Sequence, residues 1–370
     1  MLFNALFTQT TVFLTNFIEQ KPGAIIGPIS TFLGWILNFI FNVVYTFTVN
    51  NSLGLTIILF TVVARSLMLP MAFKQQKSMV AMRKIQPETE KIKEKYGNTK
   101  DPELQRKMNA EIQALYAKNK VNPLSGCLPM FVTLPIFFAL SYMLRQSFAY
   151  IDAIGNIYNG ISSVLIKDVS GYLDILKPII APMIRDGSHV EIDLALMSDI
   201  SRALNHFATA DWTSMMEQVR AVSVPAYNAI SALLVDKSAV ESFFSIDLVQ
   251  VSGLAWPGII IPILTGLTTF LSTWILNKQQ GNSGNANMKT QQTIMLVVMP
   301  LMMAWMTKGF ASGVGIYWIV GSIYQTIQQV ILNNYYVKKD TVLVSVTDVK
   351  TPKPIITLDK SKKNKKGDKA

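Results

Sequence analysis

A single permanent cation lies inside an apolar stretch near the start of the chain. Arg65 is the only charged residue between Lys21 and Lys74. A guanidinium in hydrocarbon costs at least ~2.5–3.5 kcal/mol on insertion scales, so such a residue usually faces water or a partner. Two interpretations follow. Arg65 could attract an anionic group inside a polar cavity, or its long side chain could snorkel past Met71 to the lipid headgroups.

Uncharged polar side chains recur at helical spacing beside this cation and in later apolar segments. Thr61 lies one turn before Arg65, on the same helical face. The residues predicted to line a substrate groove with Arg65 are Thr61, Thr133, Ser272, Trp318, Ser322, Gln325 and Gln328. Hydroxyls of this kind could instead make ordinary interhelical hydrogen bonds, worth about 0.6 kcal/mol each. Glutamines are costlier to bury, so Gln325 and Gln328 favour a hydrated cavity.

The sequence carries no signature of an enzyme or of a metal site. It lacks a GxxxxGK phosphate loop and an HExxH pair. Its two histidines, His189 and His206, have no nearby cysteine, and the single cysteine, Cys127, leaves no internal disulfide to form. The five apolar segments named next contain no carboxylate, which disfavours a proton-coupled transporter. We therefore predict no enzyme activity, no cofactor and no metal.

Five apolar segments must position these side chains. Half of the 370 residues are apolar and only 15% are charged, which is typical of a polytopic membrane protein. The segments long enough to cross ~30 Å of hydrocarbon are 53–73, 121–149, 251–277, 291–307 and 311–337. The predicted fold class is an all-α polytopic membrane protein with a five-span core, a cytoplasmic helical hairpin and a helical external insert.

The charges outside the apolar segments set the predicted orientation. Residues 74–120 carry 12 Lys or Arg and 6 Asp or Glu, and the tail 338–370 carries 10 Lys and 4 Asp. The short segment 278–290 adds two lysines. Residues 150–250 are instead acidic, with 6 basic and 12 acidic side chains. Because basic loops stay in the cytoplasm, we predict a multi-pass plasma-membrane protein whose three basic segments are cytoplasmic and whose acidic insert is extracytoplasmic.

The N-terminal region, 1–52, leaves two topologies open. Residues 1–18 lack the basic flank and the cleavage site of a signal peptide. Residues 31–49 are apolar but carry threonine and asparagine near helical spacing, which favours a helix lying in the outer interface of the membrane. The alternative is a sixth span that places the N-terminus in the cytoplasm.

Three segments outside the spans have a recognisable composition. Residues 74–120 are predicted to form a helical hairpin, in which Gly97 ends the first arm and Asp101 caps the second. Residues 150–250 show amphipathic helical runs and are predicted to be a small external helical domain. The lysine-rich tail 338–370 is predicted to be disordered.

Four motifs occur in order along the apolar segments and the hairpin. They read Thr-Ile-Ile-Leu-Phe-Thr-Val-Val-Ala-Arg (56–65), Met-Arg-Lys-Ile-Gln-Pro (82–87), Asn-Pro-Leu-Ser-Gly-Cys-Leu-Pro (122–129), and Tyr317-Trp318 with Gln328. This set resembles that of the YidC-type membrane protein insertases, and the resemblance covers 50–149 and 250–335.

The resemblance implies a function and a set of partners. Members of this family insert small membrane proteins, alone or beside the Sec translocon, through a hydrophilic groove open to cytoplasm and lipid and without nucleotide hydrolysis. Arg65 corresponds to the arginine of that groove. The implied partners are nascent membrane proteins, membrane lipids, the Sec translocon and, through the hairpin and the tail, the ribosome. No DNA partner is implied.

The chain also departs from the family pattern. Thr133 and Ser322 stand where the resemblance leads us to expect glutamine and asparagine. The insert 150–250 lies between the second and third core spans, whereas the large periplasmic domain of Gram-negative relatives precedes the first, so a Gram-positive-like or divergent bacterium is the expected source. The residues alone leave one other function open, a small-solute transporter or anion channel with Arg65 as the anion site.

Overall fold

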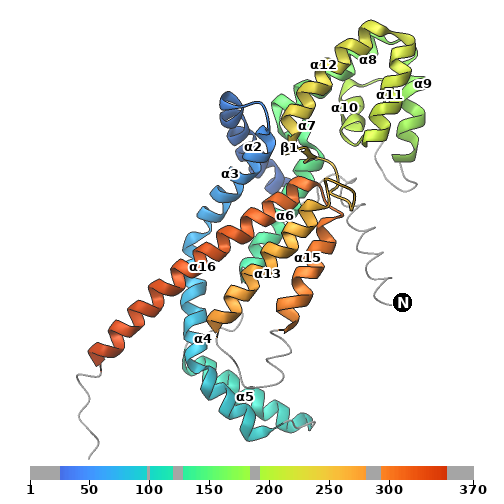
Figure 1. Cartoon of the computed structure of the whole chain (residues 1–370). Helices are drawn as coiled ribbons and strands as arrows, with labels where there is room; N and C mark the ends of the chain where they lie inside the picture. The colour runs from blue at the N-terminus through green and yellow to red at the C-terminus, as the bar shows by residue number, and fades with distance from the viewer. Residues whose placement is uncertain (1–25, 98–100, 120–127, 184–191, 281–292, 348–370) are drawn as a thin grey trace, which may run out of the picture.

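A computed structural model describes residues 26–97, 101–119, 128–183, 192–280 and 293–347. Within these ranges the structure is helical apart from one short antiparallel hairpin, β1 (Ser242–Phe243) with β2 (Ile246–Asp247). The all-α class predicted from the sequence is therefore confirmed. Figure 1 shows a central bundle with the helices of the basic segment at one end and those of the acidic segment at the other.

The central bundle gathers apolar helices around one core. Its members are α2 (Ile26–Phe47), α3 (Ser52–Leu67), α6 (Leu128–Arg145), α13 (Ile260–Gln280), the π-helical turn η3 (Ile294–Val298), α15 (Met299–Thr307) and α16 (Ser312–Thr347). Helix α2 packs on α3 and α6, while α16 packs on α3 and α13. Leu37, Ile57 and Leu144 are fully buried in one apolar cluster, and burial of this kind holds the bundle together.

Two helices in the described ranges are long and apolar enough to cross a membrane, Ile26–Phe47 and Ile260–Lys278. A third candidate combines α3 with α4 (Leu69–Tyr96), and shorter apolar helices occupy Val132–Arg145 and Ile294–Thr307. These helices agree with a multi-pass membrane protein, while the five-span core stays a prediction. Because α2 passes the same test of length and composition, the interfacial helix predicted within 31–49 and the alternative sixth span both remain open.

The first predicted span, 53–73, is not one straight helix. Helices α3 and α4 meet at Met68 with a bend of 58°. Pro70 lies in the first turn of α4, and proline has no N–H with which to continue the hydrogen-bond ladder of the preceding helix. The bend leaves Arg65 in the last turn of α3, beside the start of α4.

The basic segment 74–120 contains most of α4 and all of α5 (Pro102–Lys118), which pack against each other. Gly97 ends α4 with a φ of 62°, a conformation that favours glycine. The carboxylate of Asp101 accepts a hydrogen bond from the backbone N–H of Glu103 over 2.8 Å and so caps α5. The cytoplasmic placement of this pair stays a prediction.

The acidic segment 150–250 forms a second group of helices. After α7 (Ser147–Tyr150) it contains α8 (Asp152–Asp168), α9 (Tyr172–Ile180), the 3-10 turn η2 (Ala181–Met183), α10 (Met197–Asn205), α11 (Thr209–Val222) and α12 (Val224–Glu241). Helix α8 packs on α10 and α12, and both α12 and β1 contact α3. These contacts join the group to the end of the bundle opposite α5 (Figure 1). Its side of the membrane stays a prediction.

Candidate functional site

The guanidinium of Arg65 reaches from the last turn of α3 to α16. Its Nη1 lies 3.5 Å from Oε1 of Gln325, at the long limit of a hydrogen bond. Its Nε is enclosed and has no hydrogen-bond partner within the described ranges. No ion pair among the described residues includes Arg65. The half-buried cation is therefore surrounded by neutral groups and lacks a carboxylate partner in this part of the protein.

Gly321 makes room for this cation. A β-carbon at position 321 would lie 2.8 Å from Nη2 and 3.2 Å from Nε of Arg65, so a larger residue would displace the guanidinium. Gly321 precedes Gln325 by one helical turn on the same face of α16. One face of α16 thus supplies both the space for the cation and the amide that contacts it.

A small cavity opens beside Arg65 between the start of α4 and α16. Its volume is about 40 Å³, which is room for a few water molecules. Its walls combine the cation with five glutamines and four apolar residues: Arg65, Met68, Met71, Ala72, Gln75, Gln76, Gln325, Gln328, Gln329 and Leu332. The Nε2 of Gln328 and the Oε1 of Gln329 are buried there without a partner among the described residues. Unpaired buried amides of this kind favour water or a polar guest in the cavity.

Three of the other candidate residues lie where α13 meets α16, and their polar groups connect the two helices. The indole N–H of Trp318 donates to Oγ1 of Thr269 over 3.1 Å. The hydroxyl of Ser272 donates over 2.7 Å to the carbonyl of Thr268 in its own helix and accepts from Thr326 of α16 over 2.6 Å, with the carbonyl of Ser322 a longer acceptor at 3.3 Å. Ser272 and Trp318 therefore already take part in interhelical hydrogen bonds, and Ser322 takes part through its main chain.

The remaining two candidates are separate from the cavity. Thr61 is fully buried, and its hydroxyl donates over 2.6 Å to the carbonyl of Ile57 in its own helix. Thr133 is half-buried on α6, and no hydrogen bond between described residues joins it to the rest of the set. Of the eight residues selected from the sequence, only Arg65, Gln325 and Gln328 line the cavity together.

The candidate set from the sequence omitted four residues that complete the surroundings of Arg65. Gly321 and Gln329 flank Gln325 at i−4 and i+4, so the polar face of α16 was the signal that could have identified them. Gln75 and Gln76 fall beyond the predicted end of the first span, inside the segment assigned to the hairpin. In the structure this segment belongs to α4, which begins after the bend at Met68 and packs against α16.

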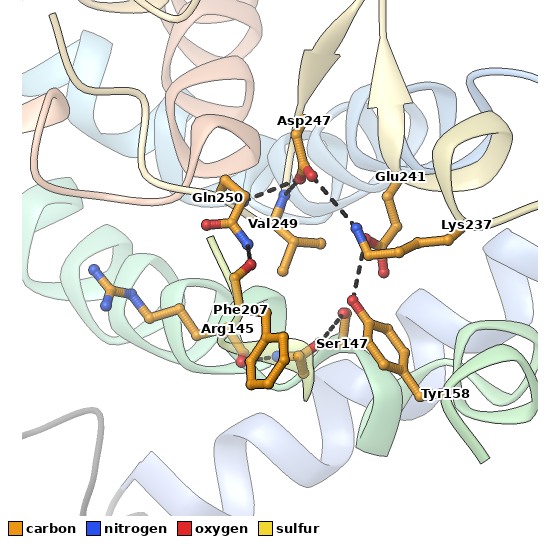
Figure 2. A network of polar contacts seen from close by, with 10 residues as sticks. Arg145, Ser147, Tyr158, Phe207, Lys237, Glu241, Asp247, Val249 and Gln250 are labelled. Atoms are coloured by element: carbon orange, nitrogen blue, oxygen red, sulfur yellow. Dashed lines mark hydrogen bonds and ion pairs between the residues drawn. The ribbon is translucent and has the colours of Figure 1, made fainter. Parts of the chain in front are cut away.

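A second buried cation occurs in the acidic segment, in a very different setting (Figure 2). The Nζ of Lys237 lies 2.8 Å from Oε2 of Glu241 and 3.5 Å from Oδ2 of Asp247. The hydroxyl of Tyr158 donates to the same Glu241 oxygen over 3.4 Å. The other oxygen of Asp247 accepts from the backbone N–H of Val249 over 2.9 Å. This cluster ties α12 and α8 to the strand that leads back to the bundle.

Burial and charge act differently on the two main members of this cluster. Burial raises the pKa of Glu241 to about 7, although the positive charge of Lys237 opposes the shift. For Lys237, burial lowers the pKa, but the charges of Glu241 and Asp247 outweigh it and the pKa rises above its usual value. Lys237 therefore stays charged. The described residues contain no group of three His, Cys, Asp or Glu side chains that could hold a metal ion.

Comparison with known proteins assigns the chain to a family. The model of the family described as 60Kd inner membrane protein matches residues 43–339, which include the cavity and its walls. A membrane protein insertase YidC of Enterococcus faecalis is 30% identical over 287 residues, which cover 78% of this chain and 69% of the relative. The YidC of Oceanobacillus iheyensis is 27% identical over 285 residues, or 77% of this chain and 75% of the relative. The YidC of Fusobacterium nucleatum is 45% identical over 103 residues, 28% of this chain and 48% of the relative.

Proposed function

The chain belongs to the family of YidC-type membrane protein insertases, and we propose that it passes polar segments of newly made membrane proteins through the cavity beside Arg65. The observation that carries this proposal is a half-buried guanidinium with no carboxylate partner among the described residues. Its neighbours are glutamine amides whose hydrogen-bonding groups are partly unused. A polar guest with a negative charge would satisfy both.

In this mechanism the polar tail of a substrate enters the cavity and exchanges bulk water for amides and a few bound waters. Arg65 attracts the acidic residues of the tail, and the attraction is much stronger in low dielectric than in water. The side chain does no covalent chemistry and no nucleotide is hydrolysed. The cavity lowers the barrier by shortening the apolar distance that the tail must cross.

The apolar segment of the substrate follows a different face of the same helix. Ile323, Ile327 and Ile331 form an exposed stripe on α16, at the i, i+4 and i+8 positions. Leu301 and Trp305 are also exposed on α15. Burial of the substrate's apolar surface in lipid along these faces releases about 25 cal/mol per Å² and drives the segment out of the protein.

The partners follow from the charges and the family. Substrates are nascent membrane proteins, and lipids surround the apolar faces. The α4–α5 pair and the basic tail 338–370 engage the ribosome from the cytoplasmic side, and the Sec translocon assists with larger substrates. The acidic segment 150–250 then lies outside the cell membrane.

Photocrosslinking during translation of a small membrane protein tests the proposal. A photoreactive residue at Gln325 is expected to crosslink to the polar tail of the substrate, and one at Ile327 to its apolar segment. Val235, which is exposed on α12, is the matched control and is expected to crosslink to neither. Equal crosslinking from Gln325 and Val235 would rule out passage through the cavity. Chloride flux through proteoliposomes without any nascent chain would instead support an anion channel.

A further inference from the structure

A second guanidinium without a counter-charge among the described residues lies on α4, beyond the cavity. Nη1 of Arg83 donates to Oδ1 of Asn333 on α16 over 2.7 Å. Its Nε and Nη2 are enclosed and have no hydrogen-bond partner in the described part of the chain. None of the ion pairs between described residues includes Arg83. Burial also lowers the pKa of Arg83, because the surroundings solvate the cation poorly.

A purely structural contact between α4 and α16 does not require a charge at this position. Asn333 offers one neutral oxygen, which already accepts a second bond from Nε2 of Gln76 over 3.3 Å. A neutral donor could make the same contact without the cost of removing a cation from water. The two unused N–H groups of Arg83 are arranged as one edge of a planar fork, which matches the two oxygens of a carboxylate.

The contact is continuous with the cavity that holds Arg65. Gln76 lines that cavity and also contacts Asn333. Gln329, another wall residue, precedes Asn333 by one turn of α16. A continuous row of polar side chains between α4 and α16 therefore runs from the Arg65 cavity to Arg83. Figure 1 shows these two helices crossing.

The spacing of the two cations suits an extended peptide. Their contacts on α16, Gln325 and Asn333, are eight residues apart, which is about 12 Å along a helix at 1.5 Å per residue. An extended chain covers that distance in about three or four residues at 3.3–3.6 Å each. One tail could therefore reach both guanidiniums when its acidic residues are three or four positions apart.

We propose that Arg83, held by Asn333 and Gln76, is a second anion subsite that binds an acidic side chain of the inserting segment while another occupies Arg65. This inference rests on the proposed function and adds a substrate preference to it. Tails with two acidic residues spaced by four positions engage both cations. Tails with one acidic residue, or with two adjacent ones, engage only one.

The test measures insertion of matched tails into proteoliposomes that contain the full chain, by protection of the tail from protease. For the wild type, two acidic residues four positions apart are expected to increase insertion by about tenfold over adjacent ones, the equivalent of about 1.4 kcal/mol. Arg83→Gln is expected to remove this advantage and to leave single-acid tails unchanged, and Arg83→Lys to restore part of it. Lys167→Gln, at an exposed position on α8 outside the proposed substrate path, is the control for lost charge and is expected to behave as the wild type.

Three results would overturn the inference. The spacing advantage could persist in Arg83→Gln, or that variant could lower insertion of every tail equally, which would indicate a structural contact. A change in the dependence on anionic lipid without a change in tail preference would instead assign Arg83 to a headgroup phosphate. Arg65→Ala in the same assay separates the two proposals. If Arg65→Ala leaves insertion of acidic tails intact, the proposed function itself fails. If Arg65→Ala lowers that insertion but Arg83→Gln leaves the spacing advantage unchanged, only the second subsite is ruled out.

Discussion

Two buried cations in this chain have opposite surroundings. Lys237 in the acidic segment lies within 2.8 Å and 3.5 Å of two carboxylates. Arg65 in the bundle has one amide oxygen at 3.5 Å and a cavity beside it. Removing one partner of a buried ion pair is strongly destabilising, because the other charge is left buried alone. Arg65 has no charged partner among the described residues that its removal would leave behind. We therefore propose a structural role for Lys237 and a substrate-binding role for Arg65, and substitutions can test each part of this comparison.

The largest effect on stability is expected from removing the paired cation. Lys237→Met leaves the buried Glu241 and the half-buried Asp247 without a counter-charge, so the free energy of unfolding should fall by about 3–5 kcal/mol. Arg65→Met leaves no carboxylate among the described residues without its counter-charge. It should therefore change the free energy of unfolding by less than about 1 kcal/mol. Thermal melting of both variants at pH 8, where Glu241 of the wild type is ionised, measures the difference. Equal losses for the two variants would contradict the comparison.

The paired cluster should also make stability depend on pH. The pKa of Glu241 in the folded protein is about 7, above its ordinary value of 4.5. The folded state therefore binds this proton more tightly than the unfolded state, and the contribution is complete below about pH 4.5 and lost as pH rises through 7. We expect the free energy of unfolding to fall by about 2–3 kcal/mol over this window. The limit follows from the difference between the two pKa values of Glu241, at about 1.36 kcal/mol per pKa unit. Glu241→Gln should flatten that part of the profile, and an unchanged slope would show that another group titrates.

A smaller effect is expected from moving the unpaired cation without removing it. Gly321→Ala places a methyl group 2.8 Å from Nη2 of Arg65, which is too close. Because a guanidinium is the end of a flexible side chain, it should shift without unfolding the bundle. Insertion of acidic tails should fall by about tenfold, or about 1.4 kcal/mol, while uncharged tails are unaffected.

The control for Gly321→Ala is Gly160→Ala on α8, where a β-carbon would meet only the end of Leu233. This variant should insert both kinds of tail normally. In an Arg65→Ala background, Gly321→Ala should have no further effect, since the group that it displaces is gone. A further loss in that background would assign Gly321 to helix packing.

The smallest effect is expected where polar groups already bond to each other. Ser272→Ala removes a hydroxyl that connects α13 with α16. Interhelical hydrogen bonds in membranes average about 0.6 kcal/mol, so insertion should change by less than about threefold for acidic and uncharged tails alike. A strong loss of insertion that is confined to acidic tails would instead indicate that Ser272 contacts the substrate.

The sequence predicted the central part of the site but not its boundary. Arg65 stood out because an isolated charge in an apolar stretch is costly, and Gln325 and Gln328 stood out because their amides repeat at helical spacing. Gln76 was not selected because it lies beyond the predicted end of the first span, in the segment assigned to the hairpin, whereas in the structure α4 packs against α16 and Gln76 contacts Asn333 there. Thr61 and Ser272 are also polar residues at helical spacing in apolar segments, which is the pattern expected of a cavity lining. Their hydroxyls instead make hydrogen bonds within their own helix or to the neighbouring one.

The paired cation was beyond sequence reasoning for a different reason. Lys237 and Glu241 are four residues apart on α12, a spacing common to exposed helical ion pairs. Their burial depends on α8, which supplies Tyr158, and on the β-hairpin, which supplies Asp247. The burial of this pair therefore depends on tertiary packing, and the local sequence pattern does not predict it.

The most direct test of the account compares three forms of residue 65 against two forms of one substrate. Wild type, Arg65→Lys and Arg65→Ala are each reconstituted into liposomes with a small membrane protein whose tail carries either aspartates or asparagines, and the protease-protected fraction is measured. The account predicts that Arg65→Ala loses insertion of the aspartate tail and keeps that of the asparagine tail, while Arg65→Lys retains much of both. If Arg65→Ala inserts the aspartate tail as well as the wild type, the unpaired cation is not the group that receives the substrate.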